Sequence, residues 1–186
     1  MANSRLNNNS RKWWLLPENR QIKKRLNIGC GNRQKPMIDG WINLDIDKNC
    51  FPDIVRDIRH GLPFEDDYFD EVLASHVLEH IESENVFFMM REIHRVCKHG
   101  AIFNIVAPHW QDKGAFDIDH KCFITSRGLS IFTKIHADIA VQNNRNIVQN
   151  CFWEPIDCFD DLKGERHEEP QTYITLKCDK SEVRKI

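Results

Sequence analysis

The feature that most limits the possible folds is a short apolar segment that ends in two closely spaced glycines. Residues 25–30 read Arg-Leu-Asn-Ile-Gly-Cys, and Gly31 and Asn32 follow directly. A brief apolar run that stops at a turn is typical of a buried strand. Two glycines around one residue permit a tight turn and let a ligand approach the backbone closely. The segment therefore predicts a strand with a binding turn at its carboxyl end.

Comparable segments recur along the chain and predict six further strands. They cover residues 41–47, 53–58, 70–78, 101–108, 146–153 and 171–179. The segment 101–108 is apolar enough to be buried on both faces of a sheet. The polar, acidic residues 157–170 are expected to be the connection between the last two strands.

Two segments have the three- and four-residue apolar spacing of helices. Residues 83–98 predict one helix, with Ser83 as its N-cap and Gly100 ending it. His94 lies among the charged positions of this helix and is expected at the surface. A shorter helix is expected over residues 126–134.

The order of these elements predicts an α/β fold with a mostly parallel sheet. Only Lys48 to Pro52 separate the second and third predicted strands. A parallel crossover normally needs a dozen or more residues, so we expect a short third strand and reduced helices there. Ligands of such sheets bind beyond the carboxyl ends of the strands. The trimmed third strand would leave a sheet edge that can support a homodimer.

Length and composition narrow the class of protein. A chain of 186 residues predicts one domain, two at most. No apolar run is long enough for a membrane span, and we expect none. The seven cysteines are odd in number and form no Cys-x-x-Cys pair, and no secretory signal is recognisable. These features favour a cytoplasmic protein with reduced thiols.

The charge is unevenly distributed. The first 25 residues hold seven basic residues and one acidic residue, although the whole chain has a net charge of −2. We expect a basic, partly disordered arm over residues 1–20 and a single domain over residues 21–180. Such an arm can contact nucleic acid, or it can be no more than a solvated tail.

An acidic residue at the end of the second predicted strand adds to the glycine turn. Asp45 is placed to accept hydrogen bonds from the two hydroxyls of a ribose. The third glycine of a dinucleotide fingerprint is replaced by Gln34, and there is little room for a helix that would face a pyrophosphate. The pattern therefore favours a nucleoside without phosphates and argues against a nicotinamide-dependent reductase.

Four segments together resemble a known family. They read LNIGCGN, GWINLDID, DIVRDIRHGLPFEDDYFDEVLASHVLEHI and REIHRVCKHGAIFNIVAPH, in that order. In order and spacing they resemble the class I S-adenosylmethionine-dependent methyltransferases, especially the small type 11 members. The resemblance covers about residues 25–125. It implies a Rossmann-like seven-stranded sheet, S-adenosylmethionine as the cofactor and S-adenosylhomocysteine as the product.

The resemblance also implies which residues bind the cofactor. They are Asn27, Gly29, Cys30, Gly31, Asn32, Asp45, Ile46, Asp57, Ile58, Ser75, His76 and His80. Gly29 and Gly31 would line the methionine part. Asp45 would bind the ribose hydroxyls, Asp57 would lie near the adenine amino group, and Ile58 would lie beside the adenine ring.

Methyl transfer from a sulfonium requires alignment of the acceptor, and a general base only where the acceptor carries a proton. His109 and His120 follow the fifth predicted strand, in a stretch that resembles the cover of the acceptor pocket. They are the candidate bases, unless they only anchor this loop. His76 and His80 are four residues apart but do not form His-Glu-x-x-His, so no metal site is expected.

The sequence does not identify the methyl acceptor. The chain lacks an Asn-Pro-Pro-Tyr motif after the fourth predicted strand, which favours a small molecule. The basic arm keeps a nucleic-acid acceptor open. A non-catalytic binding or regulatory module with the same fold is the other alternative.

Overall fold

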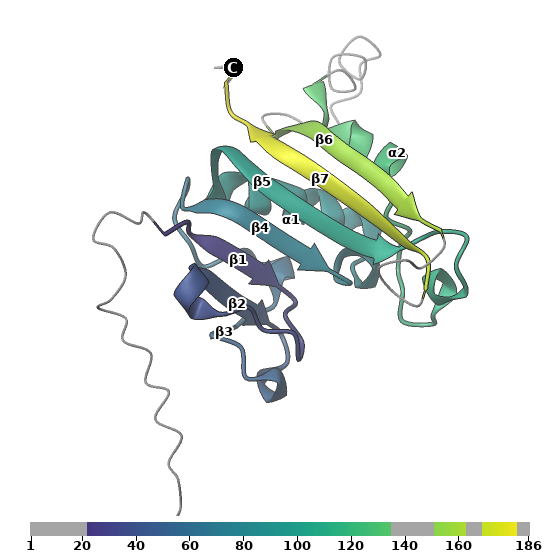
Figure 1. Ribbon diagram of the computed structural model, residues 1–186, viewed down its shortest axis with the longest axis horizontal. Coiled ribbons are helices and arrows are strands. Elements are labelled where there is room, and N and C mark those ends of the chain that lie inside the picture. Colours follow the sequence, from purple (N-terminus) through teal and green to yellow (C-terminus); the bar gives the residue numbers. More distant parts are fainter. Residues whose placement is uncertain (1–21, 135–150, 163–168, 182–186) are drawn as a thin grey trace, which may run out of the picture.

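The computed structural model describes residues 22–134, 151–162 and 169–181, and its centre is one seven-stranded sheet. The strands are β1 (Arg25–Ile28), β2 (Trp41–Asp45), β3 (Ile54–Val55), β4 (Phe69–Ser75), β5 (Cys97–Pro108), β6 (Phe152–Asp161) and β7 (Gln171–Asp179). Their order is β3-β2-β1-β4-β5-β7-β6 (Figure 1). The first five are parallel, and β7 runs antiparallel to both β5 and β6. The predicted α/β fold with a mostly parallel sheet is confirmed.

The last two strands differ from the sequence-based prediction. β6 runs over Phe152–Asp161, so the expected connection 157–170 is wrong in its first part. β6 is an edge strand that pairs only with β7, and most of its residues face solvent, which explains their polar character. Residues 146–150 of the predicted sixth strand lie outside the described residues.

Helices are few and short in the described ranges. α1 (Ser83–Val96) has 14 residues and α2 (Ser126–Leu129) only four. The remaining elements are single 3₁₀ turns: η2 (Met37–Asp39), η3 (Lys48–Cys50), η4 (Ile58–His60), η5 (Leu78–His80), η6 (Lys113–Phe116) and η7 (Ser130–Phe132). Only η2, η3 and η4 connect β1 to β4, which confirms the reduced helices. None of the described helices has the length and apolarity that crossing a bilayer requires.

α1 begins and ends differently from the prediction. Glu82 occupies the N-cap position without a capping hydrogen bond between its side chain and the helix backbone, and Ser83 is already helical. The chain passes from α1 into β5 at Cys97, three residues before Gly100, because Cys97 pairs with Phe69 of β4.

The hydrophobic core lies between α1 and one face of the sheet. α1 runs behind β4 and β5 in Figure 1 and buries Met90 and Ile93 against it. The ring of Trp153 packs 5.5 Å from Phe103 and 5.4 Å from His94. His94 is therefore buried rather than exposed, and its Nε2 lies 3.1 Å from the carbonyl oxygen of Asp179. Burial lowers the pKa of His94.

The opposite face of the sheet is only partly covered. Along β5, buried residues such as Phe103 alternate with half-buried ones such as Asn104, so the prediction of burial on both faces is wrong. A polar chain crosses four strands on this face. Arg25 Nε donates to Glu71 Oε2 over 3.0 Å, and Asn104 Nδ2 donates to Glu71 Oε1 over 3.3 Å. Thr175 Oγ1 then donates to Asn104 Oδ1 over 3.1 Å.

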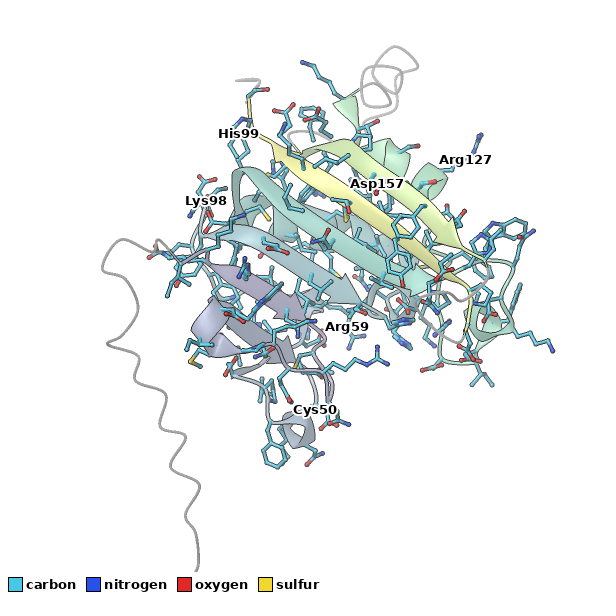
Figure 2. All side chains as sticks on the ribbon, in the orientation of Figure 1. Cys50, Arg59, Lys98, His99, Arg127 and Asp157 are labelled. Atoms are coloured by element: carbon cyan, nitrogen blue, oxygen red, sulfur yellow. The ribbon has the colours of Figure 1, made fainter. Side chains whose placement is uncertain are left out.

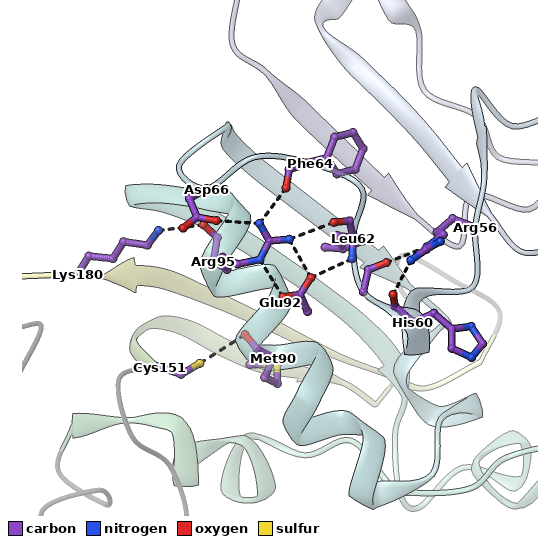
Figure 3. Close-up of polar contacts among 11 residues, drawn as sticks. Arg56, His60, Leu62, Phe64, Asp66, Met90, Glu92, Arg95, Cys151 and Lys180 are labelled. Carbon is purple, nitrogen blue, oxygen red and sulfur yellow. Dashed lines mark hydrogen bonds and ion pairs between the residues drawn. The ribbon is translucent and has the colours of Figure 1, made fainter. Parts of the chain in front are cut away.

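An ion pair on α1 holds the loop that replaces a crossover helix between β3 and β4 (Figure 3). Arg95 Nη1 donates to the carbonyl of Phe64 and Nη2 to that of Leu62, over 2.8 and 3.0 Å. Glu92 binds the same guanidinium through both oxygens at 2.8 Å and accepts a hydrogen bond from the Leu62 amide. The hydrogen bonds from Arg95 hold the pKa of Glu92 below its usual range.

Candidate functional site

A pocket of about 410 Å³ opens at the carboxyl ends of β1, β2 and β4. It is lined by Gly29, Gly31, Leu44, Asp45, Ile46, Arg56, Asp57, Ile58, Arg59, His76, Val77, His80 and Ile81. Its size is within the range of small-molecule and cofactor sites. Eight of the predicted cofactor-binding residues are among those that line it: Gly29, Gly31, Asp45, Ile46, Asp57, Ile58, His76 and His80.

The turn after β1 depends on glycine. Gly29 and Gly31 have φ angles of 61° and 47°, in the left-handed region that other residues rarely adopt. A Cβ on Gly29 would lie 2.3 Å from Cγ2 of Val77. A Cβ on Gly31 would meet no atom within 4 Å. Gly29 therefore permits close packing under the pocket, and Gly31 leaves its backbone open to a ligand.

Asp45 is buried at the end of β2, beside this turn. Its Oδ2 accepts the Gly31 amide over 2.7 Å, and its Oδ1 accepts the Asp47 amide over 2.8 Å. A carboxylate can accept about four hydrogen bonds, so two positions remain for a ligand. Ile46, the next residue, is 61% exposed at the rim of the pocket.

The rim also contains an arginine that the sequence reasoning missed. Arg59 binds both oxygens of Asp57, with Nε and Nη2 at 3.0 and 2.8 Å from Oδ1 and Oδ2. These hydrogen bonds lower the pKa of Asp57. Asp57 also caps η4 by accepting the Arg59 amide. The sequence signal for this pair is an aspartate two positions before an arginine, Asp57-Ile58-Arg59.

The end of β4 is strained at the pocket. His76 has a φ of 57° although it is not glycine, and its amide donates to the carbonyl of Val106 over 2.9 Å. Strained backbone of this kind concentrates at functional sites. Val77, the next residue, packs on Gly29, and His80 follows in η5.

Four predicted residues do not line the pocket: Asn27, Cys30, Asn32 and Ser75. The Nδ2 of Asn27 donates to Asn43 Oδ1 and to the carbonyl of Arg33, over 3.1 and 3.3 Å, and so supports the turn from beneath. Burial, with a smaller effect of the nearby Asp45, raises the pKa of the Cys30 thiol to about 11. Cys30 is therefore a neutral packing residue in this turn.

The two predicted general bases have different surroundings. His109 is 2% exposed and does not line the pocket. Its Nδ1 accepts the Gln111 amide over 3.2 Å, and its Nε2 lies 3.4 Å from Oδ2 of Asp160. Its geometry is that of a loop anchor. The ring of His120 instead lies 4.7 Å from the ring of His80, at the side of the pocket.

Comparison with protein families gives one match. Residues 34–105 match the family model described as a methyltransferase domain. This range contains Asp45, Asp57, His76 and His80 of the pocket. A search of curated proteins returned no significant match.

Solved structures show the same fold at low sequence identity. A SAM-dependent methyltransferase from Methanosarcina mazei has a TM-score of 0.59 at 16% identity, over 84% of this chain and 92% of that one. The N-methyltransferase NodS from Bradyrhizobium japonicum, in complex with S-adenosylhomocysteine, has a TM-score of 0.59 at 11% identity, over 84% and 78%. The 1,6-didemethyltoxoflavin-N1-methyltransferase from Burkholderia thailandensis has a TM-score of 0.56 at 12% identity, over 84% and 71%.

Proposed function

We propose that the chain is a class I S-adenosylmethionine-dependent methyltransferase and that it transfers the methyl group of S-adenosylmethionine to a small-molecule acceptor. The observation that carries the proposal is the position of Asp45 beside the glycine turn, in a pocket of about 410 Å³. A carboxylate and an open glycine backbone at adjoining strand ends suit a ribose and its attached chain.

The pocket suggests a place for each part of the cofactor. Asp45 has unused acceptor positions for the ribose hydroxyls. Ile46 and Ile58 offer apolar surface for the adenine ring, and the Asp57–Arg59 pair lies at the same rim. Gly31 leaves space for the methionine chain. His76 and His80 line the pocket on the β4 side, where we place the sulfonium.

Catalysis at such a site consists mainly of alignment. Bound S-adenosylmethionine would supply an electrophilic methyl group, and the residues of this chain would hold the acceptor in line with it. Holding two reactants in line supplies at best about 7–11 kcal/mol of the barrier reduction. His109 has both ring nitrogens engaged, so of the two candidate bases only His120 lies beside the pocket. The acceptor would enter from that side.

A small-molecule acceptor is supported by one structural neighbour. The Burkholderia thailandensis neighbour was solved with 1,6-didemethyltoxoflavin bound. The basic arm of residues 1–20 lies outside the described residues, so its charge is the whole argument for a nucleic-acid acceptor.

The proposal is tested in two steps on the full chain. Calorimetric titration with S-adenosylhomocysteine should show one site with micromolar affinity, and absence of binding at millimolar ligand would overturn the proposal. The second step supplies methyl-labelled S-adenosylmethionine with either a small-molecule cell extract or total RNA. Label in a small-molecule product that is separated from S-adenosylmethionine supports the proposed acceptor class, whereas label in RNA alone refutes it.

A further inference from the structure

A buried carboxylate beside the pocket lacks a hydrogen bond. Glu79 is 2% exposed, and neither of its carboxylate oxygens has a hydrogen-bond partner among the described residues. His76 Nδ1 lies 3.3 Å from Oε1, without the geometry of a hydrogen bond. Burying a carboxylate without hydrogen bonds is costly, and native proteins pair such groups with a cation or coordinate them to a metal.

Two imidazoles face the same point. One ligand atom from each of Glu79, His80 and His120 lies within 4.8 Å of the other two. The Nδ1 of His120 is buried and also has no hydrogen-bond partner in the part of the chain that is described. One carboxylate and two histidines, with further positions open, are the ligand set of many catalytic zinc and non-haem iron sites.

The backbone holds this cluster in place. The amides of Lys121 and Cys122 both donate to the carbonyl of Glu79, over 2.6 and 3.2 Å. The Cys122 thiol contacts the carbonyls of Leu78 and Ile81 at 3.4 and 3.3 Å. Segment 120–122 is thereby fastened to η5, although more than 40 residues separate the two. The three side chains are brought together before any ion arrives.

A neighbouring carboxylate orients one of the imidazoles. Asp119 Oδ2 lies 3.2 Å from Nδ1 of His80. A carboxylate on one ring nitrogen is the usual partner of a histidine whose other nitrogen binds a metal.

We infer that Glu79, His80 and His120 bind a divalent transition-metal ion of the zinc, iron or manganese group. Two imidazole ligands favour such ions over magnesium and calcium, which prefer oxygen. This proposal departs from the expectation of no metal site, which considered the spacing of His76 and His80 but not His120. Because His80 also lines the pocket, the ion would lie where the acceptor enters. If the proposed function holds, the open coordination positions of the ion would bind an oxygen or nitrogen atom of that acceptor.

Metal binding can be measured without any activity. The full chain, freed of metal by chelation, is titrated with Zn²⁺ by calorimetry and with Co²⁺ by visible absorption. We expect one site whose Co²⁺ spectrum lacks thiolate charge transfer, and affinity at least tenfold weaker in both Glu79→Gln and His120→Gln. His99→Gln is the matched control. His99 lies at the opposite end of the strands from Arg59, which lines the pocket (Figure 2). This variant should bind the metal ions with wild-type affinity.

S-adenosylhomocysteine titration of the same variants separates the two proposals. His120→Gln does not alter a pocket-lining residue, so it should bind S-adenosylhomocysteine within about twofold of the wild type. Folding is checked by circular dichroism, and His120→Gln decides the result if Glu79→Gln does not fold. Any of three results would overturn the metal site. They are the absence of 1:1 binding, a Co²⁺ spectrum with thiolate charge transfer, and unchanged metal affinity in folded His120→Gln. If the wild type does not bind S-adenosylhomocysteine, the proposed function is overturned instead.

Discussion

The backbone amide of Gly31 donates a hydrogen bond to Oδ2 of Asp45 over 2.7 Å. This bond joins the turn after β1 to the end of β2, which are neighbours in the sheet. Both parts of the proposed nucleoside site are thus fixed relative to each other without a ligand. Such preorganisation reduces the ordering cost of binding.

Removing the charge of Asp45 should weaken cofactor binding. Hydrogen bonds to a charged group contribute about 1.5–3 kcal/mol, which corresponds to roughly 10- to 150-fold in affinity. We expect Asp45→Asn to lower S-adenosylhomocysteine affinity by about that factor in calorimetry. Asp47→Asn changes an exposed carboxylate two residues away and should remain within about twofold of the wild type. Equal losses in the two variants would contradict the role of Asp45.

The two turn glycines should respond differently to alanine. Both substitutions force a left-handed φ, which costs roughly 1–2 kcal/mol. Gly29→Ala adds a contact of 2.3 Å with Val77, and overpacking of this kind costs typically about 1–3 kcal/mol more. Urea unfolding should therefore show a larger decrease in the free energy of unfolding for Gly29→Ala than for Gly31→Ala. Equal losses would mean that Val77 moves aside freely.

The Glu92–Arg95 pair should make stability depend on pH in the acid range. Because the hydrogen bonds from Arg95 hold the folded-state pKa of Glu92 below that of a free glutamate side chain, the pair stabilises the fold fully at pH values above the free value. The contribution is lost as the pH falls through the folded-state pKa. At pH 7 we expect Glu92→Gln to lower the free energy of unfolding by about 1.5–3 kcal/mol.

The difference between wild type and Glu92→Gln should shrink steadily below pH 4.5, as measured by urea titrations at several pH values. Asp66 is the control, because it binds the same arginine but its side chain is 70% exposed. Asp66→Asn should cost no more than about 1 kcal/mol. A pH-independent difference for Glu92→Gln would show that the loss is one of packing.

Cys30, in the turn after β1, should resist alkylation. Burial raises the pKa of Cys30 to about 11, whereas Cys158 is exposed on β6. At pH 8, iodoacetamide should label Cys158 well before Cys30, which peptide mass spectrometry can follow over time. Labelling of Cys30 at the rate of Cys158 would show that the turn opens in solution.

The sequence alone predicted those strands whose local pattern of apolar residues matches their burial in the fold. β1 and β2 are short, largely apolar segments that end at turns, and β7 alternates buried and half-buried residues. The predicted positions of all three were correct within two residues. β6 was missed in part because an edge strand facing water has no apolar alternation to detect. His94 was misplaced because its burial depends on Trp153, 59 residues further along the chain.

The site was predictable only where one short segment carries it. The glycine turn and Asp45 follow from their own neighbours. The surroundings of His109 depend on Asp160, and the group of Glu79, His80 and His120 depends on how a loop returns to η5. Such contacts between distant segments have no local pattern. No reading of residues 76–80 alone could pair them with His120.

The polar chain from Arg25 through Glu71 and Asn104 to Thr175 bears on how the protein folds. Side chains alternate between the two faces of a strand, so a slip of one residue exchanges the faces. A slipped β1 or β4 would bring Arg25 or Glu71 into the apolar core without its partner. Such states are costly, and the correct strand alignment is thereby selected over its nearest competitors. The polar chain on this face of the sheet thus disfavours misaligned strand pairings, in addition to any stability that its hydrogen bonds contribute.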